Sequence, residues 1–83
     1  MTMNAATSIV ESLRQAVLAA IPDAHVEAQA NSPGHYQLRV TSPAFAGKSM
    51  VQQQQMVYAA IADLMRGDNA PVHAIDRLQT AVA

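Results

Sequence analysis

The stretch HVEAQANSPGHYQLRV, residues 25–40, decides the fold. Apolar residues occupy every second position on both sides of a central Pro-Gly pair, namely Val26, Ala28, Ala30, Tyr36, Leu38 and Val40. This period of two is typical of strands that are buried on one face. Pro33 and Gly34 favour a turn, because proline fixes φ and glycine tolerates positive φ. We therefore predict an antiparallel hairpin with a loop of about four or five residues, with His35 at the loop exit.

An amphipathic helix is predicted before this hairpin. Ser8, followed three residues later by Glu11, fits a capping box, so the helix is predicted to begin at Ser8. Pro22 ends it. Its apolar face repeats at every fourth position and comprises Ile9, Leu13, Val17 and Ile21.

A second helix and a third strand are predicted after the hairpin. Phe45 lies in a loop and is interpreted as a core side chain. Ser49 is predicted to cap the helix, and Gly67 to end it. The predicted apolar face is Val57, Ile61, Leu64 and Met65. The run VHAIDRL, residues 72–78, is predicted as a strand that opens near His73. The resulting α+β fold has a three-stranded mixed sheet with helices on one face.

Composition restricts the function classes. The chain has 83 residues, of which 51% are hydrophobic, and a net charge of −1, so a single small domain without a general basic field is expected. It has no signal-peptide pattern and no apolar run long enough to span a bilayer, so a cytoplasmic protein without membrane association is predicted. No catalytic motif is present, and the chain is small for a deep pocket. An enzyme is therefore disfavoured.

Three histidines are the chemically interesting residues. His25 is interpreted as an exposed residue at the start of the first strand. His35 and His73 are candidate metal ligands, although two ligands are too few for a closed metal site. With no cysteine in the chain, a partner would have to supply the other ligands of any metal.

The ordered segments SPAFAGKSMVQQQQMVYAAIADLM (42–65) and VHAI (72–75) resemble the BolA family. The matching residues are Phe45, Gly47, Lys48, Val57, Tyr58, His73 and Ala74. GHYQLRV (34–40) is similar to the corresponding loop and strand of the bacterial IbaG-like branch. The resemblance implies one domain over residues 1–83, with an ordered core of about 8–78. It also implies a type II KH-like order, α-β-β-α-(α)-β, with a short extra turn near residues 68–71 or around Ala44.

The resemblance further implies a non-enzymatic adaptor that binds a monothiol glutaredoxin and shares a [2Fe–2S] cluster with it. Glutathione would complete the ligand set, and the chain alone would hold no cofactor. The implied role is iron–sulfur trafficking or a response to iron and redox stress. By position, His73 matches the C-terminal ligand histidine, and His35 matches a loop histidine that is a second ligand or lies beside the cluster. Histidine can replace cysteine as a cluster ligand.

The alternative is a DNA-binding transcriptional regulator of stress or cell-morphology genes. It would use the helix–turn region, with Lys48, Gln52, Gln53 and Arg39 as contacts. Many relatives carry basic residues where this chain has glutamine at 52–55, so DNA binding is expected to be weak. The glutamines are interpreted as the solvent face of the second helix. Homodimerisation, and a scaffold role with neither metal nor DNA, are left open.

Overall fold

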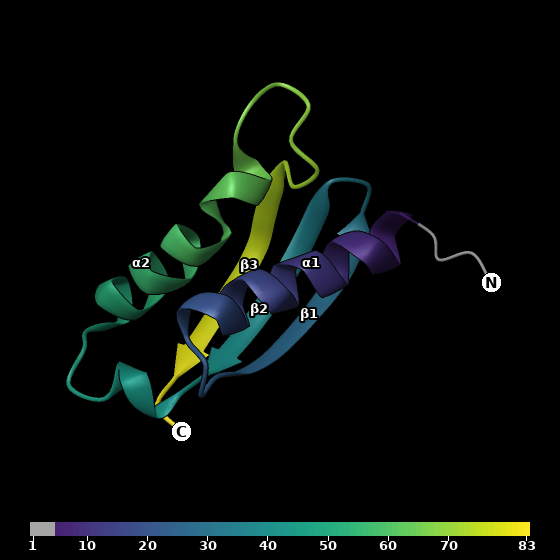
Figure 1. The fold of residues 1–83 in the computed structure, drawn as a ribbon. Coiled ribbons are helices and arrows are strands. Elements are labelled where there is room, and N and C mark those ends of the chain that lie inside the picture. The colour runs from purple at the N-terminus through teal and green to yellow at the C-terminus, as the bar shows by residue number, and fades with distance from the viewer. Residues whose placement is uncertain (1–4) are drawn as a thin grey trace.

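The computed structural model describes residues 5–83, with side chains from residue 8 onward. Two helices lie against a three-stranded sheet (Figure 1). In chain order the elements are α1 (Ala5–Ala20), β1 (His25–Ser32), β2 (His35–Thr41), the 3-10 turn η1 (Pro43–Phe45), α2 (Met50–Ile61), the 3-10 turn η2 (Ala62–Met65) and β3 (Ala74–Ala81). The predicted α+β class is confirmed. Within residues 5–83, no helix is long and apolar enough to cross a membrane.

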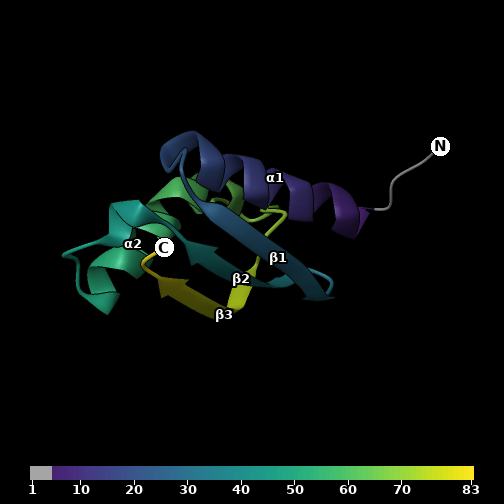
Figure 2. The ribbon, with the colours of Figure 1, turned by 90° about the horizontal axis from the view of Figure 1, so that it is seen from below.

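The sheet is mixed and has β2 at its centre. β2 pairs with β1 in antiparallel orientation and with β3 in parallel orientation. A parallel pair requires a crossover connection, and α2 supplies it. Figure 2 shows both helices on one side of the strands. The predicted three-stranded mixed sheet is therefore confirmed, and its other face is open.

The hairpin turn is shorter than predicted. β1 continues through Ser32 and β2 begins at His35, so Pro33 and Gly34 alone connect the strands. The expectation of a loop of four or five residues is wrong, because Ser32 still pairs with His35 after a register shift at Asn31. Gly34 has φ of +78°, a left-handed conformation that glycine adopts without steric cost.

The first helix begins before its predicted cap. Ser8 lies inside α1, where its carbonyl oxygen accepts a hydrogen bond from Ser12 Oγ at 3.0 Å. The Glu11 carboxylate accepts from Gln15 Nε2 at 2.9 Å and from Arg14 Nε at 3.3 Å instead of reaching back to Ser8. The predicted capping box at Ser8 is therefore wrong. The alanines that precede Ser8 are strong helix formers, which favours a longer helix.

The second helix begins at its predicted cap. Ser49 Oγ accepts from the Gln52 amide at 3.1 Å, and Gln52 Oε1 accepts from the Ser49 amide at 2.9 Å. This reciprocal pair is the capping box that the sequence predicts. A 3-10 turn, η1, lies around Ala44, one of the two positions predicted for the extra turn, although it precedes α2 instead of following it as the α-β-β-α-(α)-β order implies. In η1 the Ala44 amide donates to Ser42 Oγ at 3.0 Å. A second turn, η2, follows α2 directly.

The core lies between the sheet and the helices. Phe45 is fully buried, which confirms its interpretation as a core side chain. The other buried apolar residues come from both helices, the position after α1, the first two strands and the loop before β3, and comprise Leu13, Val17, Ile21, Val26, Tyr36, Leu38, Val40, Val57, Ile61, Ala70 and Val72. The strand predicted at residues 72–78 is observed at residues 74–81. It ends later than predicted because residues 79–81 pair with residues 39–41 of β2.

Candidate functional site

The hairpin turn and the start of β3 meet at one corner of the sheet. The Gly34 carbonyl oxygen accepts hydrogen bonds from the amides of His73 at 2.8 Å and Ala74 at 3.1 Å. In the parallel ladder, His35 pairs with Ala74. The backbone therefore brings His35 and His73 to the same corner from distant parts of the chain.

A glycine is required where His73 approaches the turn. A Cβ atom added at Gly34 would lie 2.9 Å from His73 Cγ and 3.1 Å from His73 Nδ1. Carbon atoms that are not bonded to each other pack at about 3.5–4.0 Å, so no larger residue fits without movement. The exposed imidazole of His73 therefore lies against the turn because Gly34 has no side chain.

His35 is held by a carboxylate on the open face of the sheet. Its Nδ1 lies 2.9 Å from Asp76 Oδ1, and Asn31 Nδ2 donates to Asp76 Oδ2 at 3.1 Å. The hydrogen bond with His35, and secondarily the one from Asn31, holds the pKa of Asp76 below its ordinary value. Each of the three strands thus contributes one side chain to this cluster.

His35 and His73 alone supply two nitrogen donors, fewer than the four or so ligands of a closed metal site. Within the described part of the chain, no group of three or more His, Cys, Asp or Glu side chains is arranged to hold a metal ion. His25, the third histidine, is exposed and pairs with Thr41 at the opposite end of the hairpin. His35 and His73 can offer two imidazole nitrogens, and the chain has no cysteine thiolate to offer. This pair of donors would suit an iron–sulfur cluster whose remaining ligands come from a partner.

Asp76 and Asn31 are absent from the residues predicted as functional. A signal for Asp76 is present in the sequence, because the alternation of the third strand breaks where two polar residues, Asp76 and Arg77, separate Ile75 from Leu78. Such a pair is consistent with one extra residue in a strand. No comparable signal connects Asn31 with His35, because their relation depends on strand pairing.

The residues predicted for DNA binding have different environments. Gln53 is only 7% exposed and donates to the Lys48 carbonyl at 3.0 Å, so its interpretation as a solvent-facing contact is wrong. Gln52 is exposed but takes part in the capping box of α2. Lys48 is exposed beside that helix, whereas Arg39 lies on the open face of the sheet. Gln53 lies on the side of α2 that faces the core, and the run of four glutamines in the sequence does not indicate which of them is buried.

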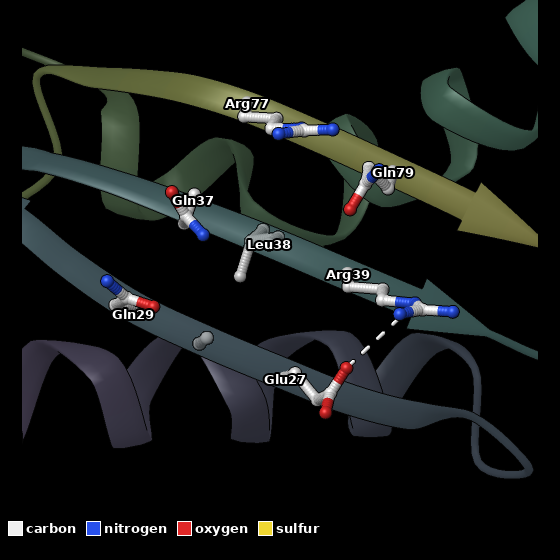
Figure 3. A pocket seen from close by; sticks show the side chains of 8 residues that line it. Glu27, Gln29, Gln37, Leu38, Arg39, Arg77 and Gln79 are labelled. Carbon is white, nitrogen blue, oxygen red and sulfur yellow. Dashed lines mark ion pairs between the residues drawn. The ribbon is translucent and has the colours of Figure 1, made fainter.

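Among the hollows that the described residues line, two concern the open face of the sheet and the hairpin turn. One, of about 290 Å³, lies on the open face and is mainly polar (Figure 3). Its polar lining consists of Glu27, Gln29, Gln37, Arg39, Arg77 and Gln79, and Arg39 Nε lies 3.9 Å from Glu27 Oε2. The other, of about 490 Å³, lies at the hairpin turn and includes Ile9, Ala30, Tyr36 and Pro71 in its lining.

Solved structures with this fold come from several organisms. The BolA domain of SufE1 from Arabidopsis thaliana is 19% identical, with a TM-score of 0.74 over 98% of this chain and 95% of that one. A BolA protein homologue from Coxiella burnetii is 22% identical, with a TM-score of 0.70 over 99% and 92%. BolA1 from Mus musculus is 24% identical, with a TM-score of 0.72 over 99% and 71%.

The sequence itself carries the family signal. A search of curated proteins found no match. The family model described as "BolA-like protein", however, matches residues 10–81, which include most of α1, all of α2, the three strands and the corner where His35 and His73 lie. The resemblance to that family is therefore confirmed, whereas the IbaG-like branch and the KH-like label stay predictions. This chain belongs to the BolA-like protein family.

Proposed function

We propose that this BolA-like chain is a non-enzymatic cytoplasmic adaptor that binds a monothiol glutaredoxin and shares a [2Fe–2S] cluster with it. Its role would be iron–sulfur trafficking or the response to iron and redox stress. The observation that carries the proposal is the position of His35 and His73 at one corner of the sheet, where the Gly34 carbonyl joins the start of β3 to the hairpin turn. His73 would be one ligand and His35 a second ligand or a neighbour of the cluster.

The environment of the two histidines supports this role. His73 is exposed, and the side chain of His35 is 44% exposed, so a partner protein can approach both. The chain has no cysteine, so its contribution would be imidazole nitrogen, while the glutaredoxin and glutathione would supply thiolates. When bound, the cluster supplies one-electron chemistry, and imidazole ligands raise its reduction potential relative to thiolates.

The test is cluster reconstitution with a monothiol glutaredoxin and glutathione, followed by visible circular dichroism. The spectrum should change in His73→Ala, because a ligand to iron is removed, and to a smaller extent in His35→Ala. His25→Ala is the matched control, since His25 is an exposed strand histidine at the opposite end of the hairpin. An unchanged spectrum in His73→Ala would contradict its role as a ligand.

The DNA-binding alternative has less support. Of its four predicted contacts, Gln53 is buried and Gln52 is used for helix capping. Two separated cations, Lys48 and Arg39, are left, and each phosphate contact contributes about 0.9 to the salt dependence of binding. A salt titration with duplex DNA distinguishes the proposals. A slope of about 3 or more would indicate several phosphate contacts and favour the alternative.

A further inference from the structure

Two strand irregularities flank β2 at Tyr36, the residue next to His35. In the β1–β2 ladder, the pairing shifts between Ala30 and Ser32, which leaves Asn31 as the extra residue. In the β2–β3 ladder, it shifts between Ile75 and Arg77, which leaves Asp76 as the extra residue. Bulges of this kind redirect a side chain and are over-represented beside functional sites. Here both neighbours of β2 have one at the same end of the sheet.

The two extra residues contact each other, and Asp76 also contacts His35. Asp76 uses one carboxylate oxygen for His35 Nδ1, at 2.9 Å, and the other for Asn31 Nδ2, at 3.1 Å. The Asn31 side-chain amide therefore donates to the carboxylate oxygen that His35 does not use. The Asp76 side chain is 39% exposed, and an exposed carboxylate is ionised at neutral pH.

An ionised carboxylate can only accept hydrogen bonds. At 2.9 Å from Asp76 Oδ1, His35 Nδ1 must therefore carry the hydrogen. In a neutral imidazole the other nitrogen, Nε2, then holds the free lone pair. Histidines that bind metals commonly donate their second N–H to a carboxylate, which fixes the tautomer and the ring orientation.

We propose that Asp76, braced by Asn31, is a positioning residue that holds His35 in the Nδ1–H tautomer and presents Nε2 as its metal-binding atom. That Nε2 meets a cluster rests on the proposed function, whereas the tautomer is a property of this chain alone. His73 has a different environment, because among the described side chains its imidazole has no hydrogen-bond partner and lies against Gly34.

The decisive experiment is a long-range ¹H–¹⁵N spectrum of the histidine side chains in the protein alone, at mildly alkaline pH. His35 should show one tautomer, with hydrogen on Nδ1. His25 and His73 provide an internal comparison and should show mixtures of tautomers. A mixture at His35 in the wild type would overturn the proposal.

Asp76→Asn is the informative variant because an amide of the same shape can donate or accept. It should convert His35 to a tautomer mixture, and Asn31→Ala should do so in part. Asp68→Asn is the control, since Asp68 is an exposed aspartate in a loop. Backbone amide spectra verify that each variant is folded. A His35 tautomer unaffected by Asp76→Asn and Asp76→Ala would overturn the role of Asp76.

A second measurement connects the tautomer to the cluster. Loss of an outer partner of a ligating histidine commonly costs 10–100-fold in metal affinity. In the complex with glutaredoxin, Asp76→Asn should therefore lower retention of the cluster against a chelator by about 10-fold relative to Asp68→Asn. Equal retention would contradict presentation of Nε2 to the cluster. If the wild type assembles no cluster, the proposed function fails, and the tautomer spectrum alone decides the role of Asp76.

Discussion

The two faces of the sheet have opposite environments although the same strands form both. Leu38 and Val40 point to the covered face and are at most 2% exposed, while their neighbour Arg39 points to the open face and its side chain is 62% exposed. The covered face excludes water and contributes stability by burying apolar area. The open face has polar side chains that remain hydrated, so its residues are available for contacts with other molecules.

The largest effect is expected at Leu38, on the covered face of β2. Leu38→Ala should lower the free energy of unfolding by about 2–5 kcal/mol, because it removes buried methyl groups and leaves a cavity. Denaturant titration measures this loss. Leu38→Met, which nearly conserves volume, is the control and should cost less than about 1.5 kcal/mol. A loss below 1 kcal/mol in Leu38→Ala would show that the covered face does not dominate stability.

Gly34 lies in the turn before β2, beside the start of β3, and its substitution tests how much the close approach of His73 contributes to stability. Gly34→Ala should cost about 1–3 kcal/mol, because φ is positive and the new Cβ would contact His73. Gly47→Ala is a matched control, with φ of +76° and nothing within 4 Å of an added Cβ. The difference between the two variants measures the contact with His73. Equal costs would mean that His73 moves freely away.

On the open face, Arg39→Ala should change the free energy of unfolding by no more than about 0.5 kcal/mol. Its nitrogen lies 3.9 Å from the Glu27 carboxylate, and both side chains are more than half exposed, so water and salt screen the pair. Thermal or chemical unfolding at low and high salt provides the measurement. A loss near that of Leu38→Ala would remove the distinction between the two faces.

The smallest effect is expected from the acid titration of Asp76. Because hydrogen bonds from His35 and Asn31 lower its pKa, ionised Asp76 stabilises the folded state at pH values above the ordinary pKa of 3.8. This contribution disappears as the pH falls through the lowered pKa of the folded state. The stability difference between wild type and Asp76→Asn should therefore shrink as the pH falls below about 4. A difference that grows in acid would contradict the sign of the shift.

Local patterns in the sequence predict most of the fold. The alternation within residues 25–40 predicts the hairpin, and Ser49 with Gln52 predicts the start of α2, because these signals act between near neighbours. His35 and His73 are candidate ligands by residue type alone, and the family resemblance adds their expected roles at a shared cluster. The hydrogen-bonded arrangement of His35, Asp76 and Asn31 depends instead on one extra residue in each of two strand pairings, and no local pattern indicates that these three residues lie together. The burial of Gln53 likewise depends on how α2 packs.

The shared acceptor at Gly34 has a consequence for motion. One carbonyl oxygen holds the amides of both His73 and Ala74, so the turn cannot swing away without releasing the start of β3. Opening of the turn and fraying of the last strand are therefore one event, and these two amides should exchange hydrogen with solvent at a common rate. The carbonyl therefore connects the turn that precedes His35 to the loop that contains His73, so a partner that displaces one of these segments also displaces the other.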